Sequence, residues 1–140
     1  MYATFDDSLI TGNEMIDEQH KELIDKINKL LKSCEESSGQ LSAIKMLEYL
    51  ADYTEFHLGE EENLQEEIDY PGLEAHKQKH EELRQTVQDL HLMLQEQEGP
   101  SEEFVKKVEE KVINWLYYHI KTFDRSIAEF IFMREQPERL

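Results

Sequence analysis

The sequence predicts an all-α fold, an antiparallel up-down-up-down four-helix bundle with a short C-terminal helix. The first observation is composition, because only five Gly and three Pro occur among 140 residues, as is typical of a helical protein. The second is that turn-forming residues gather in four short places. The long segments between them carry apolar residues every three or four positions. Short connections between long helices favour antiparallel neighbours.

The helices are expected in order at about residues 17–34, 41–66, 73–97 and 101–123, with the short C-terminal helix at 124–133. Their apolar stripes include Leu23 and Ile27 in the first segment and Val108 and Val112 in the fourth. Ser101, followed by two acidic residues, is a typical N-cap. We expect a single domain over residues 1–140, with an N-terminal arm at 1–16 and a frayed tail at 134–140.

The charge balance disfavours two classes of partner. With 32 Asp plus Glu against 15 Lys plus Arg, the formal net charge is −17, whereas nucleic acids and anionic membranes select clustered basic residues. No apolar run approaches the roughly 20 residues needed to cross a bilayer. A single cysteine, Cys34, precludes an intramolecular disulfide framework, and the start has no secretory pattern. These features favour a cytoplasmic protein without nucleic-acid or membrane partners.

Polar residues interrupt the apolar stripe of every long segment, and burying them without partners would be costly. His57 and Glu61 are four residues apart, as are His76 and His80, so each pair shares one helix face. In the predicted topology these two pairs lie at the same end of the bundle as His20 and His119. The pattern therefore predicts five imidazoles and a carboxylate in one core layer, which indicates a metal site.

Asp124 is a further candidate, but it follows His119 by five residues. On a regular α-helix that spacing is a rotation of about 500°, which leaves the two side chains about 140° apart. If Asp124 belongs to the site, the fourth helix must end or distort between them. We place that break at Lys121 to Phe123.

The donor set indicates which metal is held. Five nitrogens and two carboxylates are too many for one tetrahedral zinc ion, and they lack the all-oxygen character of calcium or magnesium sites. Two metal ions fit better, with Glu61 and Asp124 as natural bridges and the histidines divided three and two. Imidazole ligands suit iron.

Four stretches carry a resemblance to a known family: IDEQHKEL (16–23), HLGEEENL (57–64), YPGLEAHKQKH (70–80) and WLYYHIKTFD (115–124). Together they resemble the hemerythrin family, especially its bacterial members, over nearly the whole chain. The resemblance implies that His76, His80 and His119 hold one iron ion and that His20 and His57 hold the other. It also implies that Glu61, Asp124 and an oxo or hydroxo group bridge the two ions.

The resemblance further implies a non-haem di-iron protein that binds dioxygen reversibly as a carrier, store or scavenger, and is not an enzyme. A dry lining would limit proton delivery to bound dioxygen. Candidates for this dioxygen pocket are Ile24, Leu58, Trp115, Leu116 and Ile120.

Two other functions stay open. The domain could sense dioxygen, nitric oxide or redox state through a separate protein partner, whose identity the sequence does not specify. It could also reduce peroxide or nitric oxide at the di-iron centre. At the opposite end of the bundle, Cys34 and His91 form either a second thiol and imidazole site or ordinary, partly buried packing.

Overall fold

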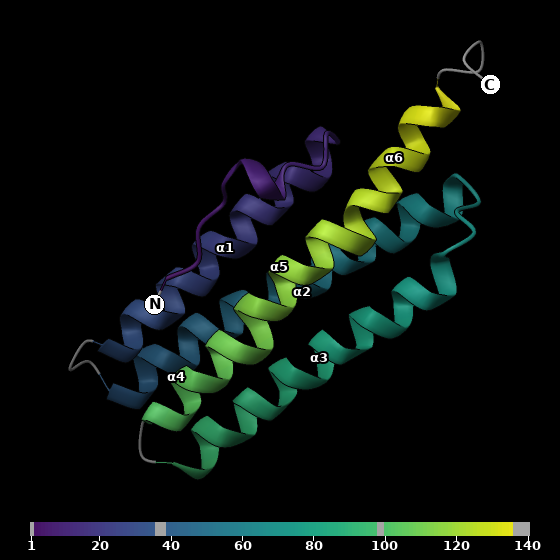
Figure 1. Cartoon of the computed structure of the whole chain (residues 1–140). Coiled ribbons are helices and arrows are strands. Elements are labelled where there is room, and N and C mark those ends of the chain that lie inside the picture. Colours follow the sequence, from purple (N-terminus) through teal and green to yellow (C-terminus); the bar gives the residue numbers. More distant parts are fainter. Residues whose placement is uncertain (1, 36–38, 98–99, 136–140) are drawn as a thin grey trace.

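The computed structural model describes residues 2–35, 39–97 and 100–135, and over these ranges it is helical without any strand. Figure 1 shows long helical rods packed side by side, as predicted for a four-helix bundle. The first three rods are α1 (Glu14–Glu35), α2 (Gly39–Glu67) and α3 (Leu73–Glu96). The fourth is continuous and consists of α4 (Glu102–Val108), η2 (Glu109–Ile113), α5 (Asn114–His119), η3 (Ile120–Asp124) and α6 (Arg125–Arg134).

The predicted apolar stripes line one continuous core. Ile27, Leu47, Leu90 and Phe104 are among its fully buried side chains, and each such residue contributes about 1.5–3 kcal/mol by leaving water. The amphipathic pattern therefore explains both why these segments are helices and which face of each helix is buried.

The first helix begins at Glu14, three residues before the predicted start. The reason is a cap: the side-chain oxygen of Asn13 accepts a hydrogen bond from the Ile16 amide at 3.0 Å. The Asp17 carboxylate in turn accepts hydrogen bonds from the Thr11 amide and hydroxyl at 2.9 and 2.7 Å. This pairing fixes the entry of the chain into α1.

A tight turn joins α2 to α3. The amide of Tyr70 bonds to the carbonyl of Gln65 at 2.9 Å and the amide of Asp69 bonds to the carbonyl of Glu66 at 3.2 Å, which is the Schellman pattern. Asp69 has the left-handed φ of 53° that this motif requires. Gly72 follows in close contact with the Tyr70 ring, where a Cβ would lie 2.7 Å from a ring carbon. The short turn keeps the end of α2 beside the start of α3.

Two π-helical turns, η2 and η3, interrupt the fourth rod without ending it. The predicted C-terminal helix is present as α6, which continues directly from η3, so it is the last part of the fourth rod. The predicted frayed tail falls largely on residues 136–140, which lie outside the described residues.

The N-terminal arm packs along α1 (Figure 1). The backbone of Ala3 exchanges two hydrogen bonds with the Asn28 side chain, at 2.8 and 2.9 Å, and the Thr4 amide donates to the Tyr117 hydroxyl at 2.8 Å. A 3-10 turn, η1 (Asp7–Leu9), buries Leu9.

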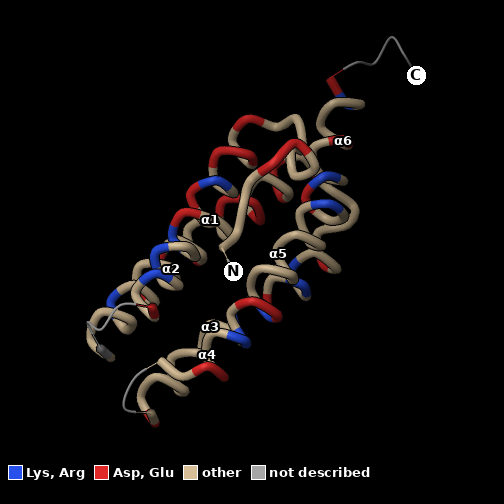
Figure 2. Tube along the Cα trace, turned by 60° about the vertical axis from the view of Figure 1, so that its left-hand side comes forward, with Lys and Arg blue, Asp and Glu red and all other residues tan. Residues whose placement is uncertain are grey.

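Figure 2 shows acidic residues spread along the bundle with basic residues among them. None of the described helices is both long and apolar enough to cross a membrane.

Candidate metal centre

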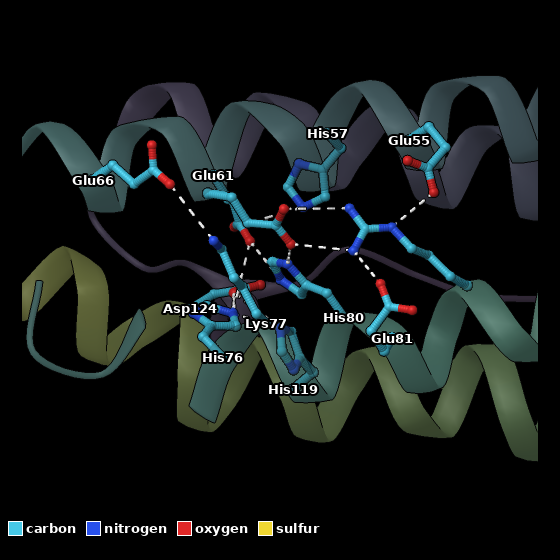
Figure 3. A network of polar contacts seen from close by, with 12 residues as sticks. Glu55, His57, Glu61, Glu66, His76, Lys77, His80, Glu81, His119 and Asp124 are labelled. Atoms are coloured by element: carbon cyan, nitrogen blue, oxygen red, sulfur yellow. Dashed lines mark hydrogen bonds and ion pairs between the residues drawn. The ribbon is translucent and has the colours of Figure 1, made fainter. Parts of the chain in front are cut away.

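The fold brings all seven predicted site residues together in one buried layer. None is more than 3% exposed, although each is polar. They come from α1, α2, α3 and the fourth rod, and Figure 3 shows several of their side chains converging between the helices. The residues are His20, His57, Glu61, His76, His80, His119 and Asp124.

Their ligand atoms fall into two groups, and the atoms of each group lie within 4.8 Å of one another. One group has five donors, Glu61, His76, His80, His119 and Asp124, and the other has four, His20, His57, Glu61 and Asp124. The two carboxylates belong to both groups. The imidazoles are therefore divided three and two.

Each carboxylate turns one oxygen toward each group. Glu61 Oε1 lies 3.3 Å from His80 Nε2, whereas Glu61 Oε2 lies 3.5 Å from His57 Nε2. Asp124 Oδ1 lies 3.0 Å from His76 Nε2, whereas Asp124 Oδ2 lies 2.8 Å from His20 Nε2. Ligands bound at about 2.1 Å to one ion lie about 3 Å apart when they are at right angles. The spacing thus fits two metal ions, one in each group, with Glu61 and Asp124 offering an oxygen to both groups.

The π-helical turn η3 explains why Asp124 faces the site. In a π turn the backbone bonds join residues five apart, so His119 and Asp124 share a face. Asp124 Oδ1 lies 3.2 Å from His119 Nε2. The predicted distortion between these residues is confirmed, and it includes the predicted segment at Lys121 to Phe123.

Unsatisfied atoms are the observation that tests whether metal ions fit. Both oxygens of Glu61 and of Asp124, together with Nε2 of His20 and of His80, are buried without a hydrogen bond of acceptable geometry. His76 Nε2 and His119 Nε2 face each other at 2.8 Å. Leaving several such atoms buried and unpaired would cost about 1–3 kcal/mol each. One metal ion within each group would satisfy them.

Two residues that the sequence analysis missed orient the imidazoles. Gln19 Oε1 lies 2.7 Å from His57 Nδ1, and Glu62 Oε2 lies 2.7 Å from His80 Nδ1. When Nδ1–H donates to these oxygens, the lone pair of each neutral ring is left on Nε2, which faces the site. Glu62 belongs to the acidic run Glu60 to Glu62, and its side chain is only 16% exposed. The signal in the sequence that could have identified Glu62 is its position next to Glu61.

Without metal, the charges of the layer shift several pKa values. Burial opposes protonation of His20, but contacts with Asp124 and Glu61 outweigh it and raise the His20 pKa to about 10. Burial lowers the pKa of His57 to about 4. Burial would raise the Glu61 pKa, but the neighbouring histidines lower it to about 2. Metal binding must therefore displace a proton from His20.

These shifts predict how the stability of the metal-free protein varies with pH. His20, whose pKa is raised, stabilises the fold fully below pH 6.5 and loses this effect as the pH rises toward 10. His57, whose pKa is lowered, favours unfolding as the pH falls from 6.5 toward 4. We expect the melting temperature, followed by circular dichroism, to peak near pH 6.5. The free energy of unfolding should fall by on the order of 5 kcal/mol toward pH 10 and on the order of 3 kcal/mol toward pH 4.

Substitution should separate the two limbs of this profile. His20→Gln should flatten the alkaline limb, His57→Gln the acid limb, and His91→Gln, outside the layer, neither. A metal-free profile that keeps its alkaline limb in His20→Gln would contradict the assignment.

Two aromatic rings stack on the imidazole of His119. Trp115 stacks on it at 4.4 Å between ring centroids and Phe123 at 5.3 Å, with interplanar angles of 12° and 10°. The indole N–H of Trp115 donates to Glu82 at 3.0 Å, so this half-buried ring is fixed at its outer edge. These stacking contacts hold the His119 ring in one orientation.

An enclosed apolar cavity of about 10 Å³ lies directly beneath the layer. Leu23, Thr54, Leu83 and Leu116 line it, each three residues from a histidine of the site on its own helix. Of the predicted dioxygen pocket, Leu116 lines this cavity, and Ile24, Leu58 and Ile120 are buried.

At the opposite end of the bundle, Cys34 is half-buried. Cys34 and His91 both lie within the described residues, and no hydrogen bond joins them.

Comparison with known proteins agrees with this geometry. The family profile described as "Hemerythrin HHE cation binding domain" matches residues 11–131. The chain is 33% identical over 124 residues to a bacteriohemerythrin of Stenotrophomonas maltophilia, covering 88% of this chain and 77% of that protein. It is 29% identical over 130 residues to one of Pseudomonas paraeruginosa, covering 93% and 82%. A crystal structure of wild-type hemerythrin matches with a TM-score of 0.79 at 25% identity, covering 92% and 97%.

A helical bundle whose core holds five histidines and two shared carboxylates defines a class of protein, the non-haem proteins with a two-metal centre. Within that class, the chain belongs to the hemerythrin family, whose domain is a non-haem di-iron site. Its buried cluster is suited to hold metal ions.

Proposed function

We propose that this protein binds dioxygen reversibly at a di-iron centre held by His20, His57, Glu61, His76, His80, His119 and Asp124. The observation that carries the proposal is the way each carboxylate directs one oxygen to each histidine group. Iron held by these residues would supply the electrons that dioxygen accepts on binding. The group with four donors has one protein ligand fewer, which leaves room for that ligand.

The side chains around the centre favour binding over further chemistry. Ile24, Leu58, Leu116 and Ile120 are buried apolar residues, and we propose them, with Trp115, as the dioxygen pocket. Such a lining excludes water and so limits proton delivery to a bound ligand. The cavity beneath the layer adds apolar space of roughly one water molecule next to the histidines.

A role as carrier, store or scavenger is our leading proposal, with sensing through a separate protein and reduction of peroxide or nitric oxide as the alternatives. A cytoplasmic location is part of the proposal, and the single cysteine suits a reducing compartment.

The test is to load the metal-free protein with two equivalents of ferrous iron without air, and then to admit dioxygen. We expect a visible absorption band that disappears when dioxygen is removed and returns over repeated cycles. Irreversible oxidation, together with steady turnover of peroxide or nitric oxide, would favour the reductase alternative. Absence of iron uptake would refute the di-iron proposal.

A further inference from the structure

The imidazoles of the site differ in what their outer nitrogen contacts. His80 Nδ1 bonds to the Glu62 carboxylate and His57 Nδ1 bonds to the Gln19 amide oxygen, both at 2.7 Å. The Nδ1 atoms of His20, His76 and His119 are buried without a partner. Among the described residues, therefore, only one imidazole of the site has a carboxylate partner at Nδ1, and it belongs to the group with five donors.

Arg84 fixes the Glu62 carboxylate in place. The guanidinium lies 3.3 and 3.4 Å from the two oxygens of Glu62, and it also contacts Glu55 and Glu81 at 2.8 Å each. The Glu62 side chain is 16% exposed, whereas those of Glu55 and Glu81 are 62% and 70% exposed. The arginine thus links two exposed carboxylates to the inner carboxylate of Glu62.

A carboxylate and an amide affect an imidazole differently. A carboxylate that accepts the Nδ1–H bond draws the proton toward itself and raises the electron density, and hence the basicity, of Nε2. An amide oxygen is neutral and makes the weaker kind of hydrogen bond. The same 2.7 Å contact therefore makes His80 a stronger donor than His57.

We propose that Glu62, positioned by Arg84, makes the two metal positions unequal: the group with five donors binds its metal ion more tightly and favours the ferric state more than the group with four. Glu62 and Arg84 are positioning residues, because they act through His80. The inference rests on the di-iron centre of the proposed function and deepens it. It assigns the more reducible position to the side with the fewer protein ligands.

Cobalt(II) titration of the metal-free protein, followed by calorimetry and the visible spectrum, tests the proposal without iron or dioxygen. We expect two sites of unequal affinity in the unmodified protein. Glu62→Gln keeps the shape and an acceptor oxygen but removes the charge. It should weaken the tighter site by about 10–100-fold, the usual effect of losing such a partner. Glu81→Gln is the matched control, because it removes an exposed partner of the same arginine, and we expect less than a twofold change.

The reciprocal change is Gln19→Glu, which gives His57 the charged partner that it lacks. It should tighten the weaker site, so that the two affinities approach each other. In the iron-loaded protein, Glu62→Gln should raise one midpoint potential. A tenfold change in the ratio of oxidised to reduced protein is about 59 mV for one electron.

Two equal Co²⁺ affinities in the unmodified protein would overturn the proposal. So would a Glu62→Gln variant that melts like the unmodified protein and keeps its two Co²⁺ affinities and its midpoint potentials unchanged. If that variant does not fold, Arg84→Met provides the second measurement. It leaves the His80 contact in place but no longer holds Glu62, so it should weaken the same site, and an unaltered affinity there would also overturn the proposal. Loss of reversible dioxygen binding with the unequal Co²⁺ sites intact would refute only the proposed function.

Discussion

Replacing Glu61 with glutamine is expected to reduce metal binding from two ions to at most one per chain. The side chain is fully buried and turns one oxygen to each histidine group. The amide of Glu61→Gln would present N–H donors to one group and would remove one of the two shared negative charges. Affinity should fall by more than about 100-fold, because outer partners alone account for 10–100-fold.

The measurement is metal content after dialysis, together with calorimetric titration. Glu60→Gln is the matched control, since it is the neighbouring acid in the same run and lies outside both donor groups, and it should retain both ions. If Glu61→Gln also retains two ions with unchanged affinity, Glu61 is not a ligand shared by the two metal positions.

The second large effect concerns the fold and not the centre. Phe104 in α4 is fully buried, fifteen residues before His119, or roughly 22 Å along the helical rod. Phe104→Ala should lower the free energy of unfolding by about 3–5 kcal/mol through lost burial and the cavity left behind. Because the substitution is remote from the site, the folded variant should still bind two ions.

Urea unfolding of the metal-free protein checks this expectation, and Phe56→Ala is its control. The Phe56 ring is 51% exposed, so its removal should cost less than about 1 kcal/mol. A Phe104→Ala variant as stable as the control would contradict the expected contribution of Phe104 to stability. A variant that folds but binds no metal would contradict the expectation that the metal centre is independent of this part of the core.

The arrangement of the helices could be predicted because the sequence repeats one amphipathic pattern between short turns. The grouping of His20, His57, His76 and His119 followed from topology, since alternating helix directions bring those positions to one end. The distortion beside Asp124 was predictable for a related reason: a five-residue spacing cannot place two side chains on one face of a regular helix.

Other features depend on contacts that the pattern does not encode. The second π-helical turn, η2, has no counterpart in the spacing of polar residues, and the start of α1 depends on the Asn13 side chain. The roles of Gln19 and Glu62 require knowing which neighbouring helix each side chain meets. Periodicity gives the buried face of a helix, but not the partner of a polar residue at its edge.

The stacking of Trp115 on His119 has an experimental consequence. The chain contains a single tryptophan, so all of its indole fluorescence originates within 4.4 Å of one imidazole of the site. A paramagnetic ion held by that imidazole would quench the emission. The protein therefore carries an intrinsic optical reporter, and the rates at which the centre fills and empties can be followed in stopped flow without a label.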